Sequence, residues 1–390
     1  MIKNNYICGV DIGTHTTRVV VMGKNKDKNL CILAVGSSPT LGVRLGYITN
    51  IDLATESVRK AIKQAEDIFG SKIKRVCVSI GGINISSIIS TGSTIISKAD
   101  QEITHLDKEK AIDSSEENID IINKKIIHII PIGYKLDGKE IYGRPEGMRG
   151  VKLEAKTFFV TCLKQNIEDI ATIFALLKIE IEDIIASPIA TSETLLSTRQ
   201  KMAGCALIDI GAETVTMIVF ENNLPISLQV FPIGSMDITK DIALGLRISL
   251  EEAESIKIGS VIGTDFSKKK IEEIIEARLS DIFELIGNHL KRIKRNELLP
   301  AGIIITGGGS YINKIEEIAK SELKLPVRIG PTDTSITNKF KIRDISWHTA
   351  IGLVVHSIDT LSSGDPSKMI NNNINQIKKF FKSIFSQLLP

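Results

Sequence analysis

Paired cysteines and clustered histidines are absent from this sequence of 390 residues. Its five cysteines stand singly in strand-like segments, YICGV, NLCIL, RVCVS, VTCLK and GCALI, and its six histidines show no metal-ligand spacing. An odd number of isolated cysteines argues against a disulfide framework and against a thiolate metal site. We therefore expect reduced, buried thiols in a cytosolic protein.

A strong charge of one sign and long apolar runs are also absent. The net charge is +3 with scattered lysines, which indicates a mixed, solvated surface and no nucleic-acid partner. The sequence contains no run of about 18 apolar residues, and its N-terminus shows no basic segment followed by an apolar stretch and a cleavage site. We expect the body of the chain to stay in the cytoplasm.

The length and the order of elements predict two lobes. A chain of 390 residues exceeds what one hydrophobic core usually supports. Strands and helices alternate, as in α/β layers; the first long amphipathic helix is expected to have Asp52 as its N-cap and to stop at Gly70. Residues 83–161 differ, because three strand-like stretches surround a charged helical stretch at 108–117. They predict a small inserted α+β domain.

Two segments repeat one pattern. VDIGTHTT at 10–17 and IDIGAETVT at 208–216 both place Asp, Ile and Gly before a turn with a threonine and then a strand. Glycine lets backbone N–H groups approach phosphate oxygens closely, and the carboxylate before the turn can hold hydrated Mg²⁺, which uses few protein ligands. Two such hairpins facing each other predict a triphosphate clamp. For a single copy, an ordinary edge hairpin is the alternative.

Two further segments supply candidate nucleotide contacts. ITGGGSYI at 305–312 ends a strand in glycines, which suits close packing of an adenosine, although a tight strand-to-helix turn is the alternative. SLEEAESIK at 249–257 places Glu254 and Lys257 on one helical face. There they could reach a ribose and a base, or form a solvated ion pair.

In this order, the paired hairpins and the glycine loop resemble the superfamily of actin, sugar kinases and heat-shock chaperone ATPases. Over essentially the whole chain the resemblance narrows to the FtsA family of bacterial cell-division proteins. It is carried by GYITNIDLATESVRKAIKQAE, PEGMRGVKLEAKTFFVT, ITKDIALGLRISLEEAESIK, TGGGSYI and WHTAIGLVV. The GMRGVKLE stretch is typical of the family's inserted domain. The resemblance implies an α/β, actin-like two-lobed fold with a duplicated ATPase core and an inserted small α+β domain.

The expected domain plan follows from these segments. The first lobe comprises residues 1–82, 162–198 and about 345–360, with 83–161 as the inserted domain. The second lobe comprises 199–235 and 298–344, with a helical subdomain at 236–297. A flexible linker at 361–373 and an amphipathic helix at 374–390 follow.

The resemblance implies ATP and Mg²⁺ as cofactors. The matching residues are Asp11, Gly13, Thr14, His15 and Thr16 in the first phosphate loop, Asp209, Gly211, Ala212 and Thr214 in the second, Gly307, Gly308 and Gly309 in the adenosine loop, and Glu254 and Lys257 in the base-contacting helix. Asp11 and Asp209 are the candidate catalytic carboxylates, and Asp11 is expected to hold Mg²⁺ through water.

Two sites depart from the family pattern. Ala212 and Glu213 stand where relatives are usually glycine-rich, which narrows the backbone cradle and adds a negative charge near phosphate. Ser187 stands before Pro188, where efficient hydrolases of the superfamily carry Glu or Gln to orient the attacking water. Without that group water is positioned less well, so we expect at most slow ATP hydrolysis.

The resemblance implies an ATP-binding protein that polymerises at the cytoplasmic face of the cell membrane and anchors FtsZ filaments there, at the division septum. Implied partners are the FtsZ C-terminal peptide, further copies of the chain, anionic lipid, and other division proteins through the inserted domain. Two alternatives stay open. A pilus-assembly ATPase of the superfamily is not expected to carry a basic amphipathic tail, and a small-molecule kinase would need a separate catalytic Asp for a hydroxyl substrate.

The helical region 236–297 is implied to receive the acidic FtsZ peptide. The segment EARLSDIFELIGNHLKRIKR sets basic side chains beside apolar ones, a mix that suits an amphipathic acidic peptide; a solvated helix face is the alternative. The basic candidates are Arg278, Lys291, Arg292, Lys294 and Arg295, of which Arg278 and Arg292 are the expected contacts.

The segment INQIKKFFKSIFSQLL at 374–389 follows the polar linker SSGDPSKMINNN. Its apolar residues fill one side of a helix and its lysines the other, and it is too short and too charged to span a bilayer. We expect it to lie in the membrane interface near anionic headgroups rather than in a packed core. The expected membrane-facing residues are Ile377, Phe380, Phe381, Lys382, Ile384, Phe385 and Leu388.

Overall fold

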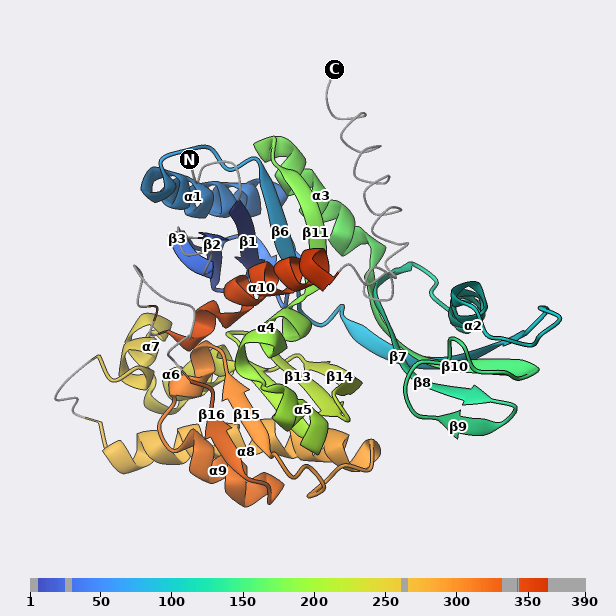
Figure 1. Ribbon diagram of the computed structural model, residues 1–390. Helices are drawn as coiled ribbons and strands as arrows, with labels where there is room; N and C mark the ends of the chain where they lie inside the picture. The colour runs from blue at the N-terminus through green and yellow to red at the C-terminus, as the bar shows by residue number, and fades with distance from the viewer. Residues whose placement is uncertain (1–5, 25–29, 261–265, 332–341, 343, 364–390) are drawn as a thin grey trace.

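Two five-stranded mixed sheets form the centres of two lobes, and a third, smaller sheet projects to one side (Figure 1). The structure is a computed structural model that describes residues 6–24, 30–260, 266–331, 342 and 344–363. The predicted two-lobed α/β architecture with a small inserted α+β domain is confirmed. The predicted membrane helix at 374–390 lies outside the described residues.

The first sheet has the strand order β11-β6-β1-β2-β3. An antiparallel meander of β1 (Tyr6–Ile12), β2 (Thr16–Lys24) and β3 (Leu30–Pro39) is extended by β6 (Arg75–Ile80) and β11 (Glu180–Ala186), which run parallel to β1. The run Val19–Val20–Val21–Met22 on β2 is fully buried on both faces. Its near-continuous apolar sequence therefore specifies a strand covered by helices on both sides.

The second sheet repeats this topology in the order β14-β13-β12-β15-β16. The meander consists of β12 (Cys205–Ile210), β13 (Val215–Glu221) and β14 (Leu224–Phe231), and the parallel strands are β15 (Ile303–Thr306) and β16 (Val327–Ile329). The two aspartate hairpins, β1–β2 and β12–β13, therefore occupy equivalent positions in the two lobes.

The helix α1 (Ile51–Phe69) packs on β3 through a buried stripe of small and branched residues, Ala54, Val58, Ala61, Ile62 and Ala65. The approach is close at Gly36, where a Cβ would lie 2.1 Å from the Ala61 carbonyl oxygen. The predicted stop at Gly70 is confirmed, but the predicted N-cap is wrong. Asn50 caps the helix by accepting from the Leu53 N–H at 3.0 Å, and Asp52 lies within the first turn.

Further helices cover the two sheets. In the first lobe these are α3 (Lys164–Leu177), α4 (Ser187–Leu195) and α10 (His348–Ser363), and α5 (Thr198–Ala203) packs beside β13 of the second lobe. The second lobe has α6 (Ser235–Leu246), α7 (Leu250–Lys257), α8 (Lys268–Arg292) and α9 (Ile315–Leu323). Because α10 continues to Ser363, the first residues of the expected linker at 361–373 are helical.

The projecting sheet has the order β7-β10-β8-β9, from β7 (Ser86–Ile95), β8 (Lys124–Leu136), β9 (Lys139–Ile141) and β10 (Lys152–Leu163). The helix α2 (His105–Glu117) covers one face and includes the helical stretch expected at 108–117. At its root, the Ser87 hydroxyl donates to the Leu228 carbonyl (3.2 Å) and accepts from the Leu228 N–H (3.0 Å). The inserted domain thus contacts the edge strand of the second lobe.

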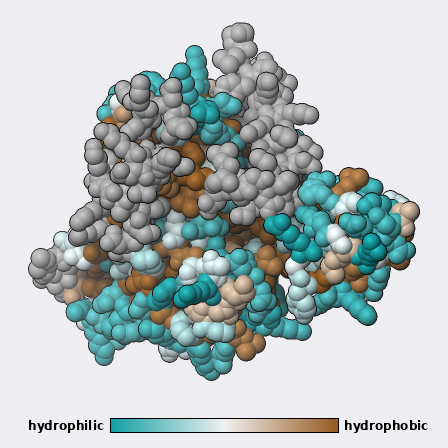
Figure 2. All heavy atoms as spheres, viewed as in Figure 1, coloured by the Kyte–Doolittle hydropathy of each residue, from teal (hydrophilic) through white to brown (hydrophobic). Residues whose placement is uncertain are grey.

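Three smaller observations bear on the sequence predictions. The five cysteines are free thiols, and all but Cys31 are buried, as predicted. Within the described ranges, no helix is both long and apolar enough to cross a membrane. Hydrophilic residues cover most of the visible surface of the second lobe (Figure 2).

Candidate functional site

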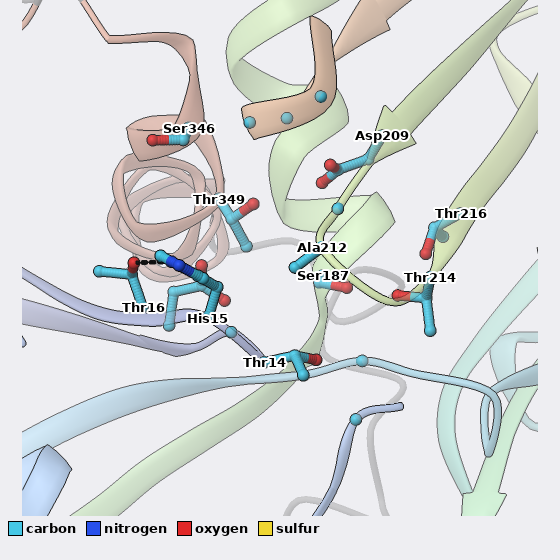
Figure 3. A pocket seen from close by; sticks show the side chains of 18 of the residues that line it. Thr14, His15, Thr16, Ser187, Asp209, Ala212, Thr214, Thr216, Ser346 and Thr349 are labelled. Atoms are coloured by element: carbon cyan, nitrogen blue, oxygen red, sulfur yellow. Dashed lines mark hydrogen bonds between the residues drawn. The ribbon is translucent and has the colours of Figure 1, made fainter. Parts of the chain in front are cut away.

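A cavity of about 400 Å³ lies between the two lobes, where both aspartate hairpins meet. Side chains of Thr14, Ser187, Ala212 and Thr349 turn toward it (Figure 3). It is lined by every residue predicted for the two phosphate loops, the adenosine loop and the base-contacting helix, namely Asp11, Gly13, Thr14, His15, Thr16, Asp209, Gly211, Ala212, Thr214, Glu254, Lys257, Gly307, Gly308 and Gly309. Segments far apart in the sequence are thus brought together as predicted.

Both hairpins leave little room for a side chain at their glycine, for the same steric reason. A Cβ on Gly13 would lie 2.8 Å from the Thr16 carbonyl oxygen, and one on Gly211 would lie 3.0 Å from the Thr214 carbonyl oxygen. In the second hairpin the Gly211 N–H donates to that Thr214 oxygen at 2.9 Å. Each turn therefore folds back on its own threonine and leaves its outer backbone facing the cavity.

The second hairpin is held by the beginning of α6. The N–H groups of Ser235 and Met236 donate to the carbonyls of Gly211 (2.9 Å) and Ala212 (2.8 Å). A Cβ on Gly234 would lie 2.4 Å from the Ala212 carbonyl oxygen, so only glycine permits this contact. The contact fixes the second hairpin against the first turn of α6, whose N–H groups hold the two loop carbonyls.

The two candidate carboxylates are largely enclosed by protein. Asp11 on β1 accepts a hydrogen bond from the Ser79 hydroxyl of β6 at 2.7 Å. Burial raises the pKa of Asp11, although Ser79 and Arg18 act in the opposite direction. Burial and the charge of Asp11 raise the pKa of Asp209 to about 6, with Arg18 opposing. Two carboxylates that disfavour each other's ionisation fit a bound cation, which would relieve their repulsion.

A cation in this cavity would have few protein ligands. Within the described part of the chain, no group of three or more His, Cys, Asp or Glu side chains could hold a metal ion. A hydrated Mg²⁺ that keeps most of its waters fits such a site, whereas a dehydrated transition metal does not. The carboxylates of Asp11 and Asp209 are therefore suited to contact through water.

Glu254 and Lys257 form an ion pair in which the lysine side chain is enclosed and the glutamate side chain is 35% exposed. Lys257 Nζ lies 2.7 Å from Glu254 Oε2, and the lysine side chain is only 7% exposed. The Lys257 ammonium also donates to Thr239 Oγ1 (2.8 Å) and to the Ser235 carbonyl (3.1 Å). Burial opposes ionisation of Glu254, but hydrogen bonds from Lys257 and Thr239 outweigh it and hold the pKa of Glu254 below its usual range.

The three glycines of the adenosine loop have different roles. Gly307 has φ +86°, and a Cβ there would lie 2.2 Å from Asp209 Oδ1; a Cβ on Gly309 would lie 2.4 Å from the Ile210 side chain. Both positions pack against the second aspartate hairpin. No atom lies within 4 Å of a Cβ on Gly308. Gly308 therefore leaves open space beside the cavity, into which a flat ring can approach.

The expectation that Glu213 adds charge near phosphate is wrong. Glu213 does not line the cavity. Its carboxylate accepts from the Leu45 N–H at 2.7 Å and pairs with Arg44 Nε at 2.7 Å. Both partners belong to a hairpin of the first lobe, β4 (Val43–Arg44) and β5 (Tyr47–Ile48). The carboxylate therefore joins the two lobes, and its charge is met by arginine.

The two arginines expected to bind a partner peptide are engaged within the second lobe. Arg278 donates to both carboxylate oxygens of Asp241, at 2.6 and 3.1 Å, and to Asp281 at 3.1 Å. Arg292 donates to Gln229 at 2.9 Å. Lys291 and Lys294 are exposed. These two lysines are thus more accessible to a partner than Arg278.

Sequence reasoning missed several lining residues of the first lobe. Ser79, Arg18, Asn166 and Thr349 all line the cavity. The signal for Ser79 is the strand end in RVCVSIGG, because parallel strands beside β1 end at the same edge of the sheet. Arg18 pairs in register with Asp11 across the β1–β2 hairpin. No local pattern marks Asn166, which enters from the first turn of α3.

Two family models match parts of this chain. The family model described as "Cell division protein FtsA" matches residues 206–352, and that of the SHS2 domain inserted in FtsA matches residues 82–161. These matches cover the second lobe with part of α10, and the projecting sheet. They include the resembling segments at 145–161, 238–257 and 306–312, whereas the segment at 46–66 lies outside them.

Similar proteins cover almost the whole chain. The cell division protein FtsA of Bacillus subtilis is 32% identical over 91% of this chain and 84% of its own length, and that of Pseudomonas aeruginosa is 29% identical over 92% and 90%. Two solved structures share the fold. The PilM–PilN type IV pilus biogenesis complex has a TM-score of 0.68 and 15% identity, over 90% of this chain and 98% of that chain. The ethanolamine utilization protein EutJ of Carboxydothermus hydrogenoformans has a TM-score of 0.54 and 17% identity, over 90% of this chain and 89% of that chain. The chain belongs to the FtsA family of actin-like cell-division proteins.

Proposed function

We propose that the chain is an ATP-binding scaffold that polymerises at the cytoplasmic face of the cell membrane and anchors FtsZ filaments there. The observation that supports the nucleotide most strongly is the pair of aspartate hairpins, which close by the same glycine geometry and face one cavity. Bound ATP would bridge the lobes through its phosphates. Its main effect would be to favour one relative position of the lobes, which is a shift between conformations rather than a reaction on a substrate.

The lining residues fit the parts of this nucleotide. The hairpin backbones at Gly13–Thr14 and Gly211–Ala212 would contact the phosphates, and Asp11 and Asp209 would hold hydrated Mg²⁺. Glu254 is held ionised by Lys257, so its carboxylate is an acceptor for ribose hydroxyl groups. Gly308 leaves room for the adenine. Ser187 lines the cavity with a hydroxyl in place of a carboxylate or amide, which agrees with slow hydrolysis.

Binding of Mg-ATP to the full chain tests the nucleotide site. Asp11→Ala and Asp209→Ala should each weaken binding at least tenfold in titration calorimetry, because each removes a charge that acts on the cation in a poorly solvated site. The circular dichroism spectrum should stay unchanged. Asp52→Ala, on the exposed side of α1, is the matched control. Equal affinity in both variants and wild type would refute the clamp.

The membrane part of the proposal rests on residues 374–390, whose sequence is that of an interfacial helix. Deletion of these residues should abolish co-sedimentation with anionic vesicles and leave Mg-ATP affinity unchanged. Phe381→Glu should have nearly the same effect. Raising salt should weaken the wild type only in part, since apolar burial persists when charges are screened. Co-sedimentation of the truncated chain would overturn the anchor.

The FtsZ part of the proposal assigns the acidic C-terminal peptide to the face of α8. Because Arg278 is paired with Asp241, its replacement would disturb the lobe as well as the surface. Lys291→Glu and Lys294→Glu change exposed side chains and are the sharper test. Both should weaken binding of an FtsZ tail peptide measured by fluorescence anisotropy, with Lys60→Glu on the exposed face of α1 as the control. If both lysine variants bound the peptide with wild-type affinity, the peptide site would not lie on this face.

A further inference from the structure

One end of the cavity extends into the first lobe, beyond the two hairpins. It is lined by Gly81 and Gly82 after β6, Ser187 at the start of α4, and Asn166 and Ile170 of α3. The parallel strands β1, β6 and β11 all end at this edge of the sheet, and α3, which leads into β11, begins there. Topology thus places the first turn of α3 beside the phosphate end of the cavity.

Asn166 is a polar residue on the apolar face of α3. It is 3% exposed, and its neighbours on that face are Ile167, Ile170, Ala171 and Phe174. Its Nδ2 faces the sulfur of Cys162 at 3.8 Å, and its Oδ1 has no hydrogen-bond partner among the described residues. A buried amide oxygen without a partner is destabilising, whereas leucine would fill the same place without that cost. Because Asn166 also lines the cavity, a ligand bound there can supply the missing partner.

Of the three carboxylates that line the cavity, two accept hydrogen bonds from described residues. Asp11 accepts from Ser79, and Glu254 accepts from Thr239 and Lys257. Asp209 lies against the adenosine loop, because a Cβ on Gly307 would lie 2.2 Å from its Oδ1. Ser187 lies over Gly81, where a Cβ would be 2.9 Å from the serine oxygen. Asn166 lines the same cavity as Ser187 and supplies an acceptor without a partner among the described residues.

We propose that Asn166 Oδ1, together with the Ser187 hydroxyl, holds the water that attacks the γ-phosphorus of ATP. This inference rests on the proposed ATP site and deepens it. In the step, the water oxygen bonds to the γ-phosphorus while the bond to the βγ-bridging oxygen breaks; ADP keeps that electron pair, and a water proton passes to the released phosphate. Phosphoryl transfer depends mainly on the position of the nucleophile, so an acceptor that orients the water sets the rate.

The test separates hydrolysis from binding. Mg-[γ-³²P]ATP is bound to excess full-length protein, and phosphate release is followed in a single turnover, with affinity measured by calorimetry. Asn166→Leu should slow hydrolysis about tenfold or more, and its affinity for Mg-ATP should stay within about twofold of wild type. A purely structural role would change affinity and rate together or neither, so a selective loss of rate identifies a water-positioning residue.

Asn84 provides a matched control. It is also buried, at 6% exposed, and both of its amide atoms lack partners among the described residues, but it does not line the cavity. Asn84→Leu makes the same chemical change away from the phosphates and should leave the hydrolysis rate at the wild-type value. If the two leucine variants slow hydrolysis equally, the effect is structural and the inference is overturned.

Ser187→Ala tests the shared water. Two groups that orient one molecule lose most of the effect when either is removed, so Asn166→Leu with Ser187→Ala should be little slower than Asn166→Leu alone. If the double variant's loss of hydrolysis rate equals the product of the two single-variant losses, the two residues do not share one water. Wild-type protein that binds Mg-ATP but hydrolyses it no faster than buffer would overturn the inference and leave the proposed function standing. Wild-type protein that fails to bind Mg-ATP would refute the proposed function itself.

Discussion

The carboxylate of Glu213, in the second aspartate hairpin, accepts a hydrogen bond from the backbone N–H of Leu45 in the first lobe at 2.7 Å. The same carboxylate pairs with Arg44, whose side chain is 67% exposed, whereas that of Glu213 is 13% exposed. Leu45 and Gly46 in turn lie on Gly82, because the Leu45 carbonyl accepts from the Ile83 N–H and the two glycines touch. Glu213 therefore fastens the β4–β5 hairpin, which forms one wall of the cavity.

Glu213→Ala should speed nucleotide release. The change removes an enclosed, charge-assisted hydrogen bond to Leu45, and such bonds contribute about 1.5–3 kcal/mol. We expect fluorescent ADP to leave about tenfold faster in stopped-flow experiments. Arg44→Ala removes an exposed ion pair and should change the rate less than about twofold. An equal effect of the two changes would mean that the ion pair, not the backbone contact, holds the lobes.

Asp209→Asn should stabilise the nucleotide-free protein at high pH. The pKa of Asp209 is about 6 in the folded chain and about 4 when unfolded, so the folded state binds the proton more tightly. The stability that protonated Asp209 contributes to the folded state is fully present below about pH 4, the pKa of Asp209 in the unfolded chain, and is lost as pH rises through 6. By pH 8 the loss is on the order of 2 kcal/mol.

Urea unfolding at pH 5 and pH 8 measures this effect. The difference in unfolding free energy between Asp209→Asn and wild type should grow with pH, and saturating Mg-ATP should remove most of it. Asp52→Asn, in the exposed first turn of α1, is the control. A difference that does not depend on pH would contradict the assigned cause.

His128 should make the protein sensitive to acid. Its Nε2 accepts from the Ala186 N–H at 3.0 Å, and burial, with a smaller contribution from His356, lowers its pKa to about 3. Because the folded pKa is depressed, the stability that neutral His128 contributes is present above about pH 6.5 and is lost as pH falls, by about 1.4 kcal/mol for each unit.

Two variants separate the hydrogen bond from the titration. His128→Gln keeps an acceptor without a titrating ring, so its unfolding free energy should depend less on pH between 6 and 4 than that of wild type. His128→Leu leaves the buried Ala186 N–H without a partner and should cost about 1–3 kcal/mol at pH 7.5. Parallel pH profiles for wild type and His128→Gln would assign acid sensitivity to other groups, such as His289.

Gly307 and Gly308 should differ sharply when replaced by alanine. Gly307 has φ +86° and ψ 171°, a conformation that alanine rarely adopts, and its Cβ would strike Asp209. Gly307→Ala should cost about 2 kcal/mol or more in thermal or urea unfolding, and it should displace the Asp209 carboxylate. Gly308→Ala meets open space and should change stability by less than about 0.5 kcal/mol. If both variants lost the same unfolding free energy, the backbone angles and the Asp209 contact of Gly307 would not explain the loss.

Much of the fold and of the site follows from local patterns. The apolar runs specify buried strands, and the repeated Asp-Ile-Gly turns locate both aspartate hairpins, because a turn that folds back on its own threonine leaves little room for a side chain at the glycine position. The triple glycine and the spacing of Glu254 and Lys257 predicted the other residues that were expected to line the cavity. Each of these signals concerns residues close in sequence, where backbone geometry is nearly enough to decide the structure.

Side-chain partners across the fold could not be predicted in this way. The direction of Glu213 depends on a hairpin 168 positions away in the chain, and the pairing of Arg278 depends on how α8 crosses α6. Ser79 and Asn166 reach the cavity because parallel strands end at one edge of a sheet, which is a property of topology. Even the α1 cap differed, since Asn50 and Asp52 are both good capping residues and the position of the first turn chooses between them. Sequence patterns record backbone conformation and burial, whereas the partner of a charged or polar group is decided by packing between distant segments.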